Sequence, residues 1–122
     1  MRDTAVRAFI KYARLGLDRR PLSASALAER LRGTFSERGI AELIAVYDTL
    51  RVLEALGRSD AADAVRAVYF RADGRVPRKN DISCAAVRFA LERHVDERTV
   101  WRHLNGAKRL YAALLKGQME KL

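Results

Sequence analysis

The chain has 122 residues, with 24 Lys+Arg against 15 Asp+Glu, which gives it a formal net charge of +9. Hydrophobic residues make up 49% of the chain, which excludes a mainly disordered basic tail, and two prolines and seven glycines are too few for a many-stranded sandwich or barrel. We therefore predict an all-α fold of five to six helices. The chain is either one compact domain or an N-terminal helical part over residues 1–58 followed by a second part over residues 59–122.

Three helices are predicted in the first part of the chain: residues 4–15, a short helix between Ser23 and Gly33, and residues 37–56. Each has apolar residues at three- and four-residue steps. The expected caps and stops are Gly16, Ser23 or Ser25, Gly33, Ser36 and Gly57. The apolar stripe of residues 37–56 is wide, which predicts that this helix is buried on more than one side and forms a central spine.

Three more helices are predicted after residue 58. The fourth is capped by Ser59 or Asp60, and residues 71–81, with the composition of a loop, follow it. The fifth is capped by Asp81 or Ser83, and its apolar residues are Val87, Phe89, Ala90 and Leu91. After a short break the last helix begins at Asp96 and runs towards the C-terminus.

The positive charge is concentrated in this second part. Residues 1–74 hold 13 basic and 10 acidic residues, a net of +3, whereas residues 75–122 hold 11 basic and 5 acidic residues, a net of +6. An excess of this kind on two helices and the loop before them favours a polyanionic partner.

Residues 82–104 form the most specific feature of the chain: a helix, a short break and a second helix that starts abruptly. This is the layout of a DNA-binding helix-turn-helix, in which the second helix lies in the major groove. We expect Val95 to be the apolar residue inside the turn. Asp96 is the expected cap, with its carboxylate accepting a hydrogen bond from the N–H of Arg98 or Thr99. The apolar residues of the inner side are Val100, Leu104 and Ala107.

The opposite side of the second helix has the side-chain types that read bases. At about 100° per residue, four residues form one line on this side: Arg98, Arg102, Asn105 and Arg109. Arg binds guanine bidentately and Asn binds adenine, so this line is predicted to read the major groove. The residues predicted to contact phosphates are Thr99, Lys108, Arg75, Arg78 and Lys79. The alternative explanation is a solvated face of a terminal amphipathic helix.

Two further residues of this helix are unusual. Trp101 lies between the two sides and is expected to be partly buried beside the preceding helix. Gly106 stands in a helix interior, where glycine costs about 1 kcal/mol relative to alanine. It allows close approach to DNA or to another helix, or it marks a bend.

The segment Asp96–Tyr111 resembles the recognition helix in the C-terminal domain of sigma factors. The resemblance is carried by a small polar cap and by Thr99, Val100, Leu104, Ala107 and Lys108. Small phage late-gene regulators of the RinA and ArpU types and phage antitermination protein Q have the same pattern near their C-terminus. The resemblance covers about residues 59–115 and implies double-stranded DNA and RNA polymerase or its sigma factor as partners. His94, in the turn, departs from the family pattern.

Catalytic and metal-binding patterns are missing from the sequence. His94 and His103 have no Cys, Asp or Glu at metal-ligand spacing, and there is no glycine-rich phosphate loop. Cys84 is the only cysteine and is expected to be a buried, inert thiol rather than a nucleophile. We therefore expect neither an enzyme nor a cofactor.

The sequence contains no run of about 18 apolar residues, as a membrane span requires, and its N-terminus lacks the pattern of a signal peptide. We therefore expect a protein without a membrane partner, located in the cytoplasm of a bacterial host cell.

The sequence predicts a DNA-binding transcription regulator, and the resemblance implies a phage late-gene antiterminator or activator that reads duplex DNA with the helix starting at Asp96. One alternative is a small terminase-like DNA-packaging subunit, which would assemble as a ring, so the oligomeric state is open. Another alternative is a helical protein-interaction module whose basic face meets an acidic partner.

Overall fold

The computed structural model describes residues 3–19, 23–70 and 76–121. These residues form six α-helices and one short 3₁₀ turn, and there is no β-strand among them. The helices are α1 (Thr4–Arg14), α2 (Ala24–Leu31), α3 (Glu37–Ala55), α4 (Ser59–Tyr69), α5 (Lys79–Arg93) and α6 (Glu97–Glu120), and the 3₁₀ turn η1 spans Leu17–Arg19. The predicted all-α fold of five to six helices is confirmed.

The first three helices begin at a side-chain cap. Each cap accepts a hydrogen bond from a backbone N–H of the first turn: Asp3 from Ala5 at 3.0 Å, Ser23 from Ala26 at 3.1 Å and Ser36 from Gly39 at 3.1 Å. Ser36 caps α3, as predicted. Of the two serines predicted as possible caps of α2, Ser23 is the one that caps it. Gly16 and Gly57 end α1 and α3 with φ of 72° and 76°, which side chains other than glycine rarely adopt.

The start of α4 differs from the prediction. Arg58 is the N-cap of this helix and makes no side-chain cap bond, so neither Ser59 nor Asp60 is the cap. The reason is the turn before it, because the N–H of Arg58 donates to the carbonyl of Leu53 at 2.7 Å, immediately after the left-handed Gly57. The chain enters α4 at once, and Ser59 is already its first residue.

The last two helices also start differently from the prediction. α5 begins at Lys79, ahead of both predicted caps, because Asp81 acts from inside the first turn: its carboxylate accepts the N–H of Arg78 at 2.9 Å. Asp96 is the N-cap of α6, as predicted, but its carboxylate accepts no cap hydrogen bond. The N–H of Thr99 donates instead to the backbone carbonyl of Asp96 at 3.0 Å.

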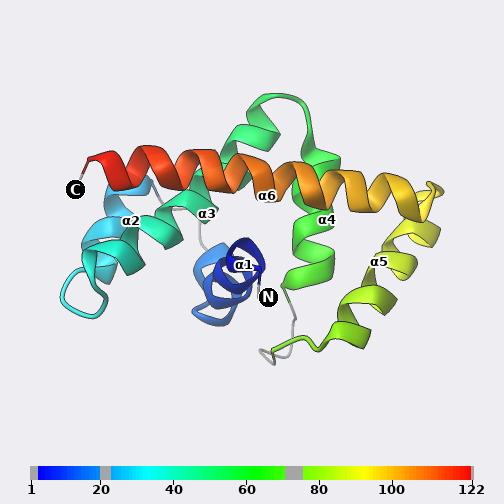
Figure 1. Ribbon diagram of the computed structural model, residues 1–122, viewed down its shortest axis with the longest axis horizontal. Coiled ribbons are helices and arrows are strands. Elements are labelled where there is room, and N and C mark those ends of the chain that lie inside the picture. Colours follow the sequence, from blue (N-terminus) through cyan, green and yellow to red (C-terminus); the bar gives the residue numbers. More distant parts are fainter. Residues whose placement is uncertain (1–2, 20–22, 71–75, 122) are drawn as a thin grey trace.

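α6 runs along the long axis of the molecule and crosses the other helices (Figure 1). Its most extensive contacts are with α3 and α4, and it also packs against α5 and α1. α3 is buried on several sides, as predicted, and contacts α1, α2 and α4 as well as α6. α3 and α6 therefore share the role of central spine that the sequence predicted for α3 alone.

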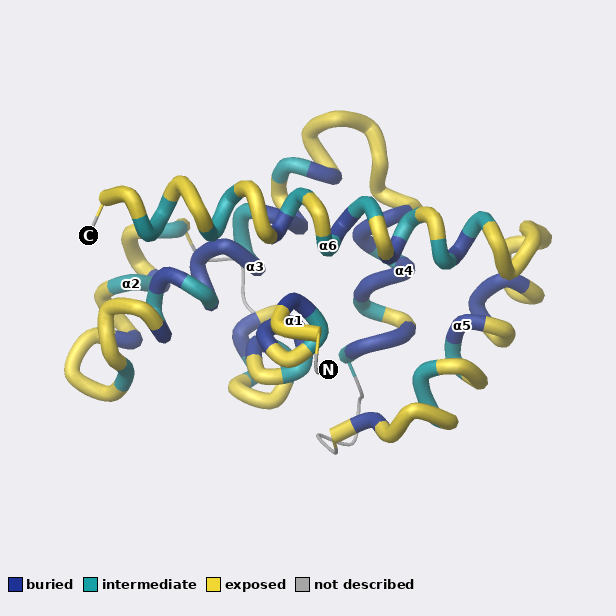
Figure 2. Tube along the Cα trace, in the orientation of Figure 1, coloured by how far each residue is buried: buried dark blue, intermediate teal, exposed yellow. Residues whose placement is uncertain are grey.

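One hydrophobic core holds the six helices together. Its fully buried residues come from both parts of the chain and include Phe9, Leu43, Val65, Leu104 and Tyr111. The ring of Phe9 lies 5.8 Å from the ring of Tyr69 and 5.6 Å from the ring of Tyr111, between centroids. Buried residues recur among exposed ones along α6 as far as Tyr111 (Figure 2), so this part of the helix has an inner and an outward side. No helix in the described ranges is long and apolar enough to cross a membrane.

Candidate nucleic-acid interface

Three residues, His94 to Asp96, connect α5 to α6 at one end of the molecule (Figure 1). His94 has a φ of 56°, in the left-handed region that glycine occupies at the ends of α1 and α3. Its N–H donates to the carbonyl of Leu91 at 3.3 Å, and the N–H of Val95 donates to the carbonyl of Ala90 at 3.0 Å. These two bonds form a Schellman cap. The turn is therefore made without glycine, at the residue that departs from the sigma-factor pattern.

Val95 does not lie inside this turn, in contrast to the prediction, because 40% of its surface is exposed. The space that α5 shares with its neighbours α4 and α6 is filled by other buried side chains, namely Ala86, Phe89, Ala90, Val100 and Leu104. The turn thus needs no further apolar residue, and Val95 remains at the surface.

The two sides of α6 differ strongly in exposure. The residues of the inner side are at most 1% exposed: Val100, Leu104, Ala107 and Tyr111. The four residues predicted to read bases are all exposed on the opposite side. We call these four, Arg98, Arg102, Asn105 and Arg109, the outer face of α6.

The three arginines of the outer face have no ion-pair partner within the part of the chain that the structure describes. Lys116 extends the same line, because it follows Arg98 by eighteen residues, which is five full turns, and it is exposed. The prediction from sequence missed Lys116, although continuing the same rotation would have found it.

Lys108 lies off the outer face and pairs with the start of α1. Its ammonium is 3.0 Å from the Asp3 carboxylate, and its side chain is 23% exposed. Burial acts to lower the pKa of Lys108, but hydrogen bonds to Asp3 and Tyr69 outweigh it and raise the pKa above its ordinary value. In the predicted phosphate contact of Lys108, a phosphate would compete with the Asp3 carboxylate for this ammonium.

Asp3 shows the complementary shift. Partial burial acts to raise the pKa of the Asp3 carboxyl, but the Lys108 ammonium and the backbone N–H groups of Val6 and Ala5 together bring the pKa below its ordinary value. The same carboxylate therefore caps α1 and holds it against α6.

Two arginines neutralise the acidic residues around α4. Arg66 lies beside three carboxylates, those of Asp18 at 3.2 Å, Glu54 at 3.6 Å and Asp63 at 3.9 Å. Arg93 pairs with Asp60 at 3.4 Å and with Asp63 at 2.9 Å. We call Arg66, Arg93 and Lys108 the paired cations. Each connects its helix to another element, and none belongs to the outer face of α6.

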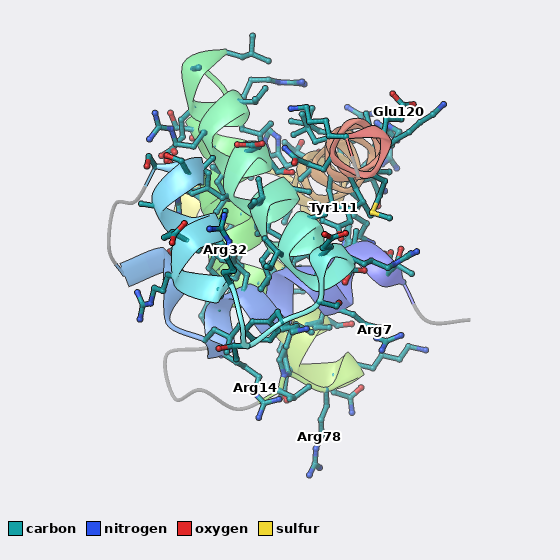
Figure 3. All side chains as sticks on the ribbon, turned by 90° about the vertical axis from the view of Figure 1, so that its left-hand side faces the viewer. Arg7, Arg14, Arg32, Arg78, Tyr111 and Glu120 are labelled. Atoms are coloured by element: carbon teal, nitrogen blue, oxygen red, sulfur yellow. The ribbon has the colours of Figure 1, made fainter. Side chains whose placement is uncertain are left out.

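Of the remaining predicted phosphate contacts among the described residues, only Thr99 lies on α6 next to the outer face. Thr99 is half-buried in the first turn of α6. Arg78 and Lys79 are exposed at the start of α5, and the 15 residues of this helix separate them from the turn by about 22 Å. Figure 3 shows Arg78 on the side of the molecule away from α6. Arg75 lies outside the described residues.

Gly106 and Trp101, the two unusual residues of α6, differ in their surroundings. A Cβ built on Gly106 meets no heavy atom within 4 Å apart from its chain neighbours and the backbone of its own helix, so this glycine serves no close approach to another helix of the described residues. α6 continues unbroken through it. Trp101 is half-buried against the core, as predicted.

α5 exposes apolar side chains where the prediction expected a buried stripe. Val87 and Leu91 are 43% and 71% exposed, whereas Ala86, Phe89 and Ala90 face the core. Cys84 is also exposed, so the prediction of a buried thiol is wrong. Apolar residues occupy two sides of α5, and only the packing against α4 and α6 decides which side is covered.

Comparisons of the chain with models of protein families, with curated proteins and with solved structures gave no match. The geometry and charge of α6 are therefore the basis for assigning a function.

Proposed function

We propose that the protein binds double-stranded DNA with the outer face of α6 and acts as a transcription regulator. The observation that carries this proposal is a line of exposed side chains of base-reading type whose arginines have no ion-pair partner in the described ranges: Arg98, Arg102, Asn105 and Arg109. An arginine without a carboxylate partner presents its planar fork of N–H donors to guanine, and an asparagine amide both donates to and accepts from adenine.

The position of the outer face suits a major groove. The groove is about 12 Å wide and admits an α-helix. Because the α5–α6 turn lies at one end of the molecule (Figure 1), the first half of α6 can enter a groove while most of the protein stays outside it. From Arg98 to Arg109 the helix rises about 16 Å, which is close to five base-pair steps of about 3.4 Å.

Charge and resemblance support the same proposal. The net charge of residues 75–122 is +6, and the paired cations are engaged in ion pairs elsewhere, whereas the arginines of the outer face have no carboxylate partner within the described residues that would compete with a polyanion. Thr99 and the N-terminal backbone N–H groups of α6 are the groups closest to the turn for a phosphate. The resemblance of Asp96–Tyr111 to sigma factors supports late-gene activation or antitermination in a phage, with RNA polymerase or its sigma factor as a second partner.

A selection of binding sites from a random duplex library tests the proposal. We expect enrichment of a short motif. Arg102→Ala should bind the enriched duplex with a loss of about 1–3 kcal/mol, which is about 5- to 150-fold, and should bind a random duplex only slightly more weakly than the unaltered chain.

Lys79→Ala is the matched control, because it also removes one exposed cation, but at the far end of α5. Its affinity for the enriched duplex should stay within about twofold of the unaltered chain. Failure to enrich a motif contradicts the proposal, and so does an equal loss for Arg102→Ala on enriched and random duplexes.

A further inference from the structure

A groove of about 890 Å³ lies between α1 and the start of α3. Figure 3 shows Arg7 and Arg14, which line it, in the lower half of the molecule, whereas α6 is seen end-on in the upper half. The groove and the outer face of α6 therefore lie on different sides, and both can be occupied at once. The volume falls in the range of about 300–1,000 Å³ that is typical of ligand sites.

Positive charge dominates the lining of this groove. Among the described residues its cations are Arg7, Lys11, Arg14 and Arg38, and the one carboxylate in this part of the lining is that of Glu42. Arg38 lies 3.8 Å from Glu42, which leaves the three cations of α1 in excess. α1 itself contains no acidic residue, and within the described ranges its cations have no ion-pair partner.

Two of these cations stand where the helix dipole disfavours a positive charge. Arg7 closes the first turn of α1, and Arg38 is the second residue of α3. Lys11 and Arg14 differ, because they belong to the last turn of α1, where a cation stabilises the helix. Local helix stability therefore explains Lys11 and Arg14, and the i,i+4 ion pair with Glu42 accounts for Arg38. Arg7 has no such local explanation, and it lines the groove.

The groove also exposes apolar side chains. Leu15 is 39% exposed and Val76 is 52% exposed, and half-buried Ile10 lies beside them in the lining. A phosphate backbone has no apolar surface to place against these side chains, whereas an amphipathic helix has one. Together, the charge and the apolar surface favour a peptide over a nucleic acid.

We propose that this groove binds an acidic amphipathic segment of a partner protein. Its apolar side chains cover Leu15 and Val76, and its carboxylates pair with arginines of the lining, foremost Arg7. This site is independent of the DNA-binding function proposed for α6, since the two surfaces share no residue.

A display library of random peptides of 16 residues, selected on the full chain, tests the proposal. We expect enriched peptides to combine Asp or Glu with Leu, Ile or Phe at three- and four-residue steps. A ¹⁵N chemical-shift titration with an enriched peptide should perturb the amides of residues 7–15 and 38–43 and leave those of the outer face of α6 unchanged.

Charge-reversal variants sharpen the test. Arg14→Glu should weaken binding of the enriched peptide by about fivefold or more. Arg30→Glu is the matched control, because Arg30 is also an exposed arginine in the last turn of a helix but does not line the groove. Leu15→Gln keeps the charge and should also weaken binding, and thermal melts of all three variants verify that they are folded.

Four outcomes would overturn the proposal. The first is no enrichment, and the second is enrichment of acidic peptides without apolar residues. The third is an equal effect of Arg14→Glu and Arg30→Glu. The fourth is displacement of the peptide by random duplex DNA together with perturbation of the same amides, which would make the groove a nucleic-acid surface.

Discussion

The paired cations and the outer face of α6 show two uses of the same residue types. Arg66, Arg93 and Lys108 lie 3.2, 2.9 and 3.0 Å from a carboxylate. The arginines of the outer face have no such partner in the described part of the chain. Net charge alone does not separate the two groups. The difference teaches that neutralisation by neighbouring helices decides which cations remain available to a polyanion.

The two groups also differ in what they do for the fold. Each paired cation lies at a junction of elements: Arg66 joins α4 to η1 and α3, Arg93 joins α5 to α4, and Lys108 joins α6 to α1. The arginines of the outer face form no ion pair that connects α6 to another element within the described ranges. Substitutions should therefore affect stability in one group and DNA binding in the other.

The largest expected effect on stability is that of Arg66→Ala. It leaves the carboxylates of Asp18, Glu54 and Asp63 close to one another without their shared cation, so the free energy of unfolding should fall by about 1–2 kcal/mol. Arg98→Ala removes an exposed arginine that has no ion-pair partner among the described residues. It should change the free energy of unfolding by less than about 0.5 kcal/mol. Urea unfolding at pH 7 measures both.

The same two variants should show the reverse order in duplex binding. Arg66→Ala, measured well below its unfolding temperature, should bind the enriched duplex as the unaltered chain does, whereas Arg98→Ala should bind it more weakly. If Arg66→Ala weakens duplex binding as much as Arg98→Ala does, the division into two groups has no functional meaning.

Gly106→Ala is expected to stabilise the protein by about 0.5–1 kcal/mol, because alanine is the better helix former and its Cβ meets nothing within 4 Å. Gly106 follows Asn105 at the edge of the outer face, and no contact within the described chain requires a glycine there. We therefore expect this variant to be more stable and to bind the enriched duplex more weakly. An unchanged duplex affinity would exclude close approach of DNA at this position.

Much of the fold could be predicted because its signals are local. Ser36 caps α3 and Gly57 ends it as predicted, since a side-chain oxygen near a first-turn N–H and a left-handed glycine depend only on adjacent residues. The starts of α4 and α5 were misplaced, because Arg58 enters α4 straight from the preceding turn and Asp81 acts from inside its helix. The left-handed conformation of His94 could not be predicted, because a histidine does not mark the end of a helix in the sequence as a glycine does.

The outer face could be predicted because the inner side of α6 is unambiguous: Val100 and Leu104 fix the rotation of the helix. The partner of Lys108 could not be predicted, because Asp3 stands at the other end of the chain and meets it only through the packing of α1 on α6. α5 has apolar residues on two sides, so the exposure of Leu91 was not predictable either. The placement of single side chains thus depends on tertiary contacts that helical periodicity does not contain.

Among the contacts of the paired cations, the smallest expected effect on stability is that of opening the Asp3–Lys108 pair. Asp3→Asn keeps an acceptor for the cap of α1, since Asn caps a helix about as well as Asp, but it removes the charge opposite Lys108, at a cost of about 0.5 kcal/mol at pH 7. The pKa of Asp3 lies below its ordinary 3.8 in the folded protein, so this contribution is present above the unfolded pKa and is lost as the pH falls through the folded pKa. The free energies of unfolding of the two proteins, measured in urea, should therefore differ by the same amount from about pH 8 to pH 5 and converge as the pH falls through the folded pKa of Asp3. A difference that does not shrink as the pH is lowered below 3.8 would mean that the cap, and not the ion pair, distinguishes the two proteins.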